Sequence, residues 1–232
     1  MGARLDQHFM VDEDALRKIC GYAKLEGGDT VLEVGAGQGA LTVELSKRAK
    51  VIAVEKGGDL SRFLRKRFAG ANVQVVEGDV LKIDLPKFNK FVSNIPYSIS
   101  KKILLKLIQE DFEVAVLVVQ KEVAEKIVAK PGNKRYGVLA VAIQSQAKVE
   151  MLDVLPRNVF KPQPRVTSSI VRITRFKEPV EKGFLDFITG IFQQRNKLIR
   201  KAVDFEVGGK YSGRRVSTLS PDELSEIYSK NG

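Results

Sequence analysis

The segment Asn94-Ile95-Pro96-Tyr97 combines residue types that could hold a planar exocyclic amine. The Asn94 carboxamide oxygen and the Ile95 carbonyl can each accept one N–H group. Pro96 fixes the backbone between them and the Tyr97 ring, which can stack on a base. None of these groups is charged at neutral pH, which favours transfer of a group to an amine over hydrolysis. Turns also use Asn and Pro for conformational reasons alone, so the segment by itself leaves a purely structural role open.

A glycine-rich segment, residues 33–39 (Glu-Val-Gly-Ala-Gly-Gln-Gly), joins a predicted strand to a predicted helix. Gly35 and Gly37 allow the backbone to pass close to a ligand. The third glycine comes one residue earlier than in the G-x-G-x-x-G pattern of dinucleotide sites. Glu55 ends the next predicted strand, where a carboxylate would meet ribose hydroxyls. The pattern favours a nucleoside ligand, and the alternative is a tight strand-to-helix turn.

A third carboxylate follows the next predicted strand, at Gly78-Asp79, with Val80 beside it. An Asp at this place is suited to accept a hydrogen bond from an adenine amino group. Successive strand ends therefore carry the glycine loop, Glu55, Asp79 and the Asn94 segment. In an open α/β sheet such strand ends line one crevice, so we expect these residues to form a single site.

The elements that must position these residues alternate between strand and helix, which predicts a doubly wound, mostly parallel α/β sheet. The continuous apolar run 114–119 indicates a central strand buried on both faces. Asp12 is the expected N-cap of the first helix. We expect strands at 30–34, 51–55, 73–76, 91–93, 114–119, 149–155 and 168–174, the last two paired, and helices at 12–24, 39–49, 59–68, 99–109, 121–129 and 136–146.

The organisation changes near residue 176, after which only short helices are predicted, at 184–193, 197–203 and 221–228. Ser220 is a plausible N-cap of the last of them. We therefore expect a catalytic domain at 1–176 and a small helical domain at 177–232. So short a segment buries little core alone, so we expect it to pack on the larger domain.

The charge of the chain is uneven, with 39 basic and 28 acidic residues and a formal net charge of +11. Residues 100–176 hold 14 basic and 7 acidic residues, so the surplus gathers after the Asn94 segment. A solvated lysine-rich face is one explanation, and a nucleic acid partner is the other. The candidate phosphate contacts are Lys101, Lys102, Lys134, Arg135, Arg157, Lys161, Arg165 and Lys197.

The composition also argues against several classes of protein. One cysteine, Cys20, and one histidine, His8, exclude an internal disulfide and a multi-histidine or thiolate metal site, so no metal is expected. An NAD-dependent oxidoreductase would need a proton-handling residue that the chain does not offer. No run of about 20 apolar residues is present, and the N-terminus has no apolar signal core. We expect no membrane contact and a cytoplasmic or nuclear location.

The order of these motifs resembles class I S-adenosylmethionine-dependent methyltransferases that act on an exocyclic amine. Residues 7–10 (Gln-His-Phe-Met) resemble the Q-N/H-F-L signature of ribosomal RNA adenine dimethyltransferases, and residues 160–168 resemble their F-x-P-x-P-x-V-x-S loop. Residues 119–124 and 195–197 also resemble family segments. The resemblance runs from Gln7 to about Ala202 and implies a Rossmann-like methyltransferase sheet with a small C-terminal helical domain. Met10 and Ile95 each stand where the family has Leu, a similar apolar residue.

The resemblance also implies roles for individual residues. S-adenosylmethionine would be the cofactor, with its ribose on Glu55 and its adenine amine on Asp79. Tyr97 and Phe160 would stack on the target adenine, whose N6 would bond to Asn94 and Ile95. The implied catalytic set is Asn94, Ile95, Pro96, Tyr97 and Phe160, and the implied cofactor-binding set is Gln7, His8, Met10, Gly35, Gly37, Glu55, Asp79, Val80 and Asn94.

The substrate implied by the resemblance is a pair of adjacent adenosines near the 3′ end of small-subunit ribosomal RNA, dimethylated at N6 by a monomeric enzyme during subunit assembly. The first alternative is the related type that dimethylates one large-subunit adenosine and confers antibiotic resistance. The second is a non-catalytic RNA-binding assembly factor. The motifs of the chemistry are shared by both enzyme types, so the alternatives stay open at this point.

Overall fold

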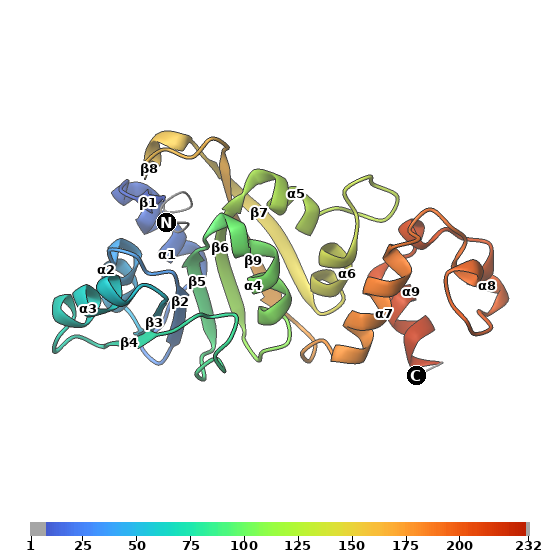
Figure 1. Ribbon diagram of the computed structural model, residues 1–232, viewed down its shortest axis with the longest axis horizontal. Helices are drawn as coiled ribbons and strands as arrows, with labels where there is room; N and C mark the ends of the chain where they lie inside the picture. Colours follow the sequence, from blue (N-terminus) through green and yellow to red (C-terminus); the bar gives the residue numbers. More distant parts are fainter. Residues whose placement is uncertain (1–7, 231–232) are drawn as a thin grey trace.

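The computed structural model describes residues 8–230, and its centre is a seven-stranded sheet (Figure 1). The strand order is β4-β3-β2-β5-β6-β9-β7. The first five strands in that order are parallel, whereas β9 runs antiparallel to both of its neighbours. The strands are β2 (Thr30–Val34), β3 (Lys50–Glu55), β4 (Val73–Glu77), β5 (Lys90–Asn94), β6 (Val114–Gln120), β7 (Ala147–Leu155) and β9 (Ser168–Arg175).

Helices cover both faces of this sheet because the central strands are apolar on both sides. On β6, Val116 and Val118 belong to the core that includes α1 and α2, whereas Leu117 and Val119 belong to the core that includes α4 and α6. The predicted doubly wound, mostly parallel α/β fold is confirmed, and β6 is the buried central strand that its sequence predicted. The helices are α1 (Glu13–Ala23), α2 (Ala40–Ser46), α3 (Gly58–Arg67), α4 (Ser100–Leu107), α5 (Lys121–Ile127) and α6 (Val138–Gln144).

Local signals set several helix boundaries as expected. Asp12 caps α1, since its side chain accepts a hydrogen bond of 2.8 Å from the Ala15 amide. Ser220 caps α9 (Pro221–Ser229) in a capping box, in which Glu223 bonds back to the Ser220 amide. Such caps satisfy amides that the first turn of a helix leaves unpaired.

A second, two-stranded sheet was not predicted. Strand β1 (Phe9–Met10) pairs antiparallel with β8 (Phe160–Lys161), so that Met10 lies opposite Phe160. This pairing places the N-terminal segment beside the proline-rich connection between β7 and β9 (Figure 1). The two segments are 150 residues apart in the chain and meet above the sheet at the end that carries the glycine loop.

The C-terminal part is helical and packs on α6 (Figure 1). Ile188 and Ile191 of α7 (Lys182–Phe192) belong to the same buried core as Leu139 of α6. The remaining α-helices of this part are α8 (Gly209–Ser212) and α9. The helix predicted at 197–203 is wrong, because only the 3-10 turn Ile199–Lys201 forms there. The domain division at 176/177 stays a prediction.

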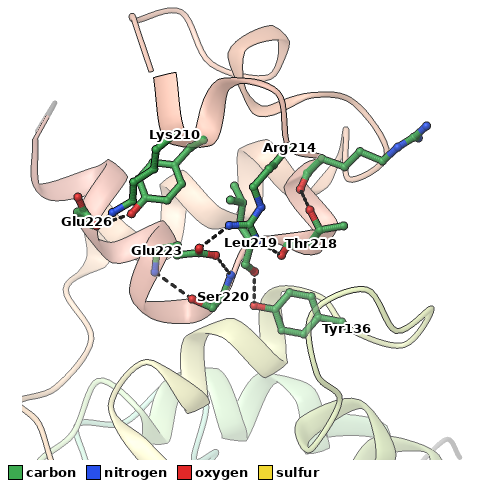
Figure 2. Close-up of polar contacts among 10 residues, drawn as sticks. Tyr136, Lys210, Arg214, Thr218, Leu219, Ser220, Glu223 and Glu226 are labelled. Atoms are coloured by element: carbon green, nitrogen blue, oxygen red, sulfur yellow. Dashed lines mark hydrogen bonds and ion pairs between the residues drawn. The ribbon is translucent and has the colours of Figure 1, made fainter. Parts of the chain in front are cut away.

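One buried hydroxyl joins this C-terminal part to the segment before α6. The side chain of Tyr136 is fully buried, and its hydroxyl donates a hydrogen bond of 2.9 Å to the Leu219 carbonyl (Figure 2). Burial raises the pKa of this phenol, so it remains a donor at physiological pH. The contact fixes the loop 130–137 relative to the end of the C-terminal part.

Candidate active site

The carboxyl ends of four parallel strands meet at one edge of the sheet. In the ladder, Val34 lies opposite Val54, Glu55 opposite Glu77 and Asn94 opposite Val118. The glycine loop follows β2, Glu55 ends β3, Asp79 follows β4 and Asn94 ends β5. The register therefore brings these predicted site residues to the same edge, which is where ligands bind in open α/β sheets.

The glycine loop has a conformation and contacts that side chains would disturb. Gly35, Gly37 and Gly39 have φ values of +69°, +57° and +80°. A Cβ atom on Gly37 would lie 2.8 Å from the Phe9 ring, and one on Gly35 would lie 3.1 Å from Pro96. The loop is therefore held between β1 and the Asn94 segment, and its glycines serve both the backbone conformation and this close packing.

Glu55 is a buried carboxylate at the centre of this edge, with 7% of its surface exposed. It accepts hydrogen bonds from the Gly37 amide at 3.0 Å and from the Gly57 amide at 2.9 Å. These two backbone donors orient the carboxylate between the glycine loop and the start of α3. A carboxylate in this place can accept hydrogen bonds from a diol, and its assignment to a ribose stays a prediction.

Asp79 lies one strand further along and remains ionised. Lys56 pairs with it at 3.0 Å, and the Leu81 amide donates to it at 3.1 Å. Both contacts lower the pKa of the Asp79 carboxyl, with Lys56 the larger cause. The neighbouring Val80 is buried, and its carbonyl accepts a hydrogen bond of 2.9 Å from Lys106 of α4. The turn after β4 is thus fixed by contacts on both sides of Asp79.

Asn94 and Ile95 present two oxygen acceptors at the same edge. The Asn94 amide group donates a hydrogen bond of 3.1 Å to the His8 carbonyl, which fixes the orientation of its side chain. The Ile95 amide donates to the Val118 carbonyl at 3.1 Å, which fixes the backbone at this point. Within residues 8–230, no donor occupies the Asn94 Oδ1 atom or the Ile95 carbonyl. The half-buried Asn94 can therefore accept a hydrogen bond from a bound amine through Oδ1. Ile95 is 1% exposed, so acceptance by its carbonyl stays a prediction.

The aromatic residues of the predicted site differ in their exposure. Tyr97 is half-buried, with its hydroxyl 2.5 Å from Ser168 Oγ and its ring centroid 5.5 Å from that of His8. His8 in turn lies 2.8 Å from the Pro162 carbonyl. Phe160, in contrast, is fully buried and belongs to the core that contains Met10. Stacking of Phe160 on a base stays a prediction, and it requires a movement that uncovers the ring.

The structure thus brings together all the predicted site residues that it describes, although Phe160 lies beneath the surface of the site. Gln7 lies outside the described residues. Two carboxylates and a glycine loop at one sheet edge match the amine, hydroxyl and methionine groups of S-adenosylmethionine in hydrogen-bonding chemistry. These residues therefore fit this cofactor.

Two residues of the site had no predicted role. Glu33 is 2% exposed, and the Thr42 hydroxyl donates a hydrogen bond of 2.6 Å to its carboxylate. Burial, with a smaller contribution from the Glu55 carboxylate, raises the pKa of Glu33 to about 8 against the opposing effect of the Thr42 hydrogen bond. Ser168, which positions the Tyr97 hydroxyl, ends the segment 160–168. Glu33 belongs to the glycine-rich segment 33–39 and Ser168 to the segment 160–168. Their roles depend on burial and on contacts between distant segments, which a sequence motif does not reveal.

A mostly parallel sheet of this order, with a glycine loop after β2 and Asn-Ile-Pro-Tyr after β5, defines a Rossmann-like methyltransferase of the S-adenosylmethionine-dependent class. The prediction of this cofactor is confirmed at the level of the class. A model of the ribosomal RNA adenine dimethylase family matches residues 2–217. The chain belongs to this family, as the sequence motifs predicted.

Curated relatives from archaea match most of the chain. The probable ribosomal RNA small subunit methyltransferase A of Thermococcus onnurineus is 37% identical over 247 residues, which cover 96% of this chain and 89% of that protein. The protein of the same name from Thermococcus sibiricus is 41% identical over 202 residues, which cover 86% of this chain and 74% of that protein.

Solved structures of two methyltransferases match over nearly the full length. A dimethyladenosine transferase from Plasmodium falciparum has a TM-score of 0.85 and 27% identity, covering 95% of this chain and 96% of its own. The 23S rRNA methyltransferase ErmE has a TM-score of 0.74 and 28% identity, covering 96% and 98%. None of the helices in residues 8–230 is long and apolar enough to cross a membrane.

Proposed function

We propose that the protein transfers methyl groups to N6 of two adjacent adenosines near the 3′ end of small-subunit ribosomal RNA, within an assembling subunit, to give N6,N6-dimethyladenosine. The observation that carries this proposal is the pair of acceptors formed by Asn94 Oδ1 and the Ile95 carbonyl at the edge that holds Glu55. The similarity to the probable ribosomal RNA small subunit methyltransferases A of two Thermococcus species supports the small subunit as the source of the RNA. A cytoplasmic location follows from this substrate, and a monomer is the proposed working form.

S-adenosylmethionine, when bound, supplies a methyl group attached to a cationic sulfur. The sulfur becomes a neutral thioether when the methyl group is transferred, so no acid is needed to expel it. Glu55 would accept hydrogen bonds from the ribose hydroxyls, Asp79 would accept one from the adenine amine, and the glycine loop would hold the methionine half. His8 and Met10 close the wall of the site through β1. This assignment of the described residues is supported by their common sheet edge and by the two amides that orient Glu55.

The chemical difficulty lies in the nucleophile, because the N6 lone pair of adenine is delocalised into the ring. Hydrogen bonds from N6 to Asn94 Oδ1 and to the Ile95 carbonyl orient this lone pair toward the methyl carbon. Methyl transfer would form the new N–C bond as the C–S bond of the cofactor breaks, with the electron pair of that bond left on sulfur. One N6 proton then passes to water. Catalysis of this kind depends on positioning and on electrostatic complementarity.

Tyr97 provides the face on which the target base stacks, an interaction worth roughly 1–3 kcal/mol. The hydrogen bond between Tyr97 and Ser168 holds the ring at the mouth of the site. The adenosine must leave its stack to reach this place. The surplus of positive charge supports an RNA partner, because all eight candidate phosphate contacts are exposed in the structure.

The similarity to ErmE makes dimethylation of a large-subunit adenosine the second candidate function. The experiment that separates the two uses labelled S-adenosylmethionine with undermethylated small subunits or with isolated large-subunit RNA, followed by nucleoside analysis. Labelled N6,N6-dimethyladenosine from the small subunit alone is the expected result. Label in the large-subunit RNA would favour the second function. No label in either RNA, with cofactor still bound, would favour a non-catalytic assembly factor.

A further inference from the structure

A hollow of about 390 Å³ opens beside the target-base site, at the carboxyl end of β6. Its lining includes Gln120, Lys121, Arg135, Val166 and Thr167. The volume falls within the ~300–1,000 Å³ of sites that bind small ligands. Apart from the candidate phosphate contact Arg135, no residue with a role assigned above lines this hollow.

The sheet register relates the hollow to Tyr97 through a residue that both adjoin, Ser168. Gln120 lies directly opposite Ser168 in the antiparallel pair of β6 and β9. Opposite residues of an antiparallel pair carry their side chains on the same face. Since Ser168 Oγ lies 2.5 Å from the Tyr97 hydroxyl, Gln120 and Tyr97 flank the same serine. A nucleotide adjacent to one that stacks on Tyr97 is therefore within reach of the hollow.

The polar group in the hollow is suited to an adenine. The Gln120 carboxamide has no hydrogen-bond partner within residues 8–230. A glutamine side chain can accept a hydrogen bond from adenine N6 and donate one to N7 at the same time, which a guanine does not permit. Val166 is 43% exposed and offers an apolar surface against which the base can pack.

The hollow is lined by two basic and two acidic residues, and one of the basic residues has no acidic partner among the described residues. The two carboxylates of its lining are already paired, Glu125 with Arg135 and Glu122 with Lys126. Lys121 has no acidic partner among the described residues and leaves a positive charge at the rim. A phosphate group can therefore bind here without a conflict with unpaired carboxylates.

The wall that carries Arg135 is fixed by the C-terminal part of the chain. Tyr136 bonds to the Leu219 carbonyl, as Figure 2 shows, and the Gly132 amide donates to the Ser217 carbonyl at 2.7 Å. Arg195 donates to the carbonyls of Lys134 at 3.0 Å and of Asn133 at 3.2 Å. The hollow thus exists in a defined shape before any ligand binds.

We propose that this hollow binds the adenosine next to the target in the RNA, with its base edge on Gln120 and its phosphate on Lys121 and Arg135. The inference rests on the proposed function and specifies how the enzyme selects a pair of adenosines. It also gives the pair an order, because a dimethylated neighbour has no N6–H group left to donate to Gln120. The adenosine whose neighbour occupies the hollow is therefore methylated first.

The test uses small subunits in which one or the other of the two adenosines is replaced by guanosine, and it measures kcat/KM for methylation of the remaining adenosine. With the unaltered protein, one of the two replacements should lower kcat/KM about five-fold or more, as expected for one lost bidentate contact. In the Gln120→Ala variant, the same replacement should lower kcat/KM by less than about two-fold, because the carboxamide that distinguishes adenine from guanine is absent. Gln74→Ala, which removes an exposed glutamine on β4, is the matched control and should behave as the unaltered protein.

A penalty for guanosine that is the same in the unaltered protein and in Gln120→Ala would overturn the inference. So would the absence of any penalty in the unaltered protein. Either result leaves the proposed function standing as long as the unaltered protein still methylates the natural pair. Loss of all methylation by the unaltered protein would instead remove the proposed function itself.

A second measurement addresses the phosphate contact. Arg135→Ala should raise KM by the same factor for small subunits with an adenosine and with a guanosine next to the target. It should also reduce the salt dependence of RNA binding by about one counterion. Arg62→Ala on α3 removes an exposed arginine that is also paired with a carboxylate, and it is the matched control. An unchanged salt dependence for Arg135→Ala would place the phosphate elsewhere and overturn the proposed role of this residue.

Discussion

Pro96 lies against Gly35, so closely that a Cβ atom on the glycine would be 3.1 Å from the proline ring. The turn that carries Asn94 and Ile95 and the glycine loop are therefore in direct contact. The distance between the two sites is set by this packing of backbone against a rigid ring. A change on either side should alter both.

Replacement of Gly35 by alanine is expected to weaken cofactor binding and slow methyl transfer. Its φ of +69° makes any side chain strained, by about 1–2 kcal/mol, and the new methyl group would press on Pro96. Gly70→Ala is the matched control, since Gly70 has a φ of +80° and no atom within 4 Å of the added Cβ. Calorimetric titration with S-adenosylmethionine should show a loss of affinity only in Gly35→Ala. Urea unfolding should show a loss of stability in both variants, larger in Gly35→Ala because of the contact with Pro96. Equal affinities in the two variants would contradict this account.

Replacement of Glu55 by alanine is expected to reduce the affinity for S-adenosylmethionine while RNA binding is unchanged. The loss of a hydrogen-bonded carboxylate should cost about 1–3 kcal/mol of binding free energy. The same variant should lower the free energy of unfolding, because the buried Gly37 amide loses its partner. Glu77→Ala is the control, since Glu77 lies opposite Glu55 in the ladder but is exposed. If Glu55→Ala bound the cofactor as tightly as the unaltered protein does, the proposed hydrogen bonding of Glu55 to the ribose would be wrong.

The stability of the protein should fall as the pH rises between about 4.5 and 8. Burial raises the pKa of Glu33 from 4.5 to about 8, so in this window the folded protein holds a proton that the unfolded chain has released. The free energy of unfolding should then decrease by up to about 1.4 kcal/mol per pH unit from this group. Above pH 8 both states are ionised and the contribution is constant.

Urea unfolding of the protein and of Glu33→Gln across this window tests the assignment. The glutamine side chain keeps a neutral acceptor for the Thr42 hydroxyl and cannot ionise. The free energy of unfolding of Glu33→Gln should therefore increase relative to that of the unaltered protein as the pH rises. Glu77→Gln changes an exposed carboxylate and should give a difference that does not vary with pH. If Glu33→Gln also gave a difference that does not vary, the group would not be the source of the pH dependence.

The sequence predicted the sheet and the ends of its strands because these depend on local patterns. The apolar run of β6 and the residues that follow β2, β3, β4 and β5 can be read directly from the chain, and the register then brings them together. The helix expected at 197–203 does not form, since Ile199 donates to the Arg214 carbonyl and Val216 donates to the Lys197 carbonyl. These distant partners take the backbone groups that a helix would have used.

The burial of Phe160 and the formation of strand β1 also could not be predicted from the sequence, because both depend on contacts between distant segments. Two residues cannot show a periodic pattern, and β1 exists only because β8 pairs with it. Gln120 lies in a segment that resembles the family, yet only the strand register places it opposite Ser168, the partner of the Tyr97 hydroxyl. Residue types predicted the chemistry, while the contacts between distant segments set its geometry.

The central claim is that Asn94 positions the amine of the target adenosine. Single-turnover methyl transfer by Asn94→Ala, with saturating RNA and cofactor, measures this most directly. The rate should fall by roughly 10²–10³-fold, as for the loss of one preorganised hydrogen bond in a transition state. RNA affinity should stay close to that of the unaltered protein and of the exposed-site control Asn72→Ala. A rate of methyl transfer in Asn94→Ala equal to that of the control would contradict the account.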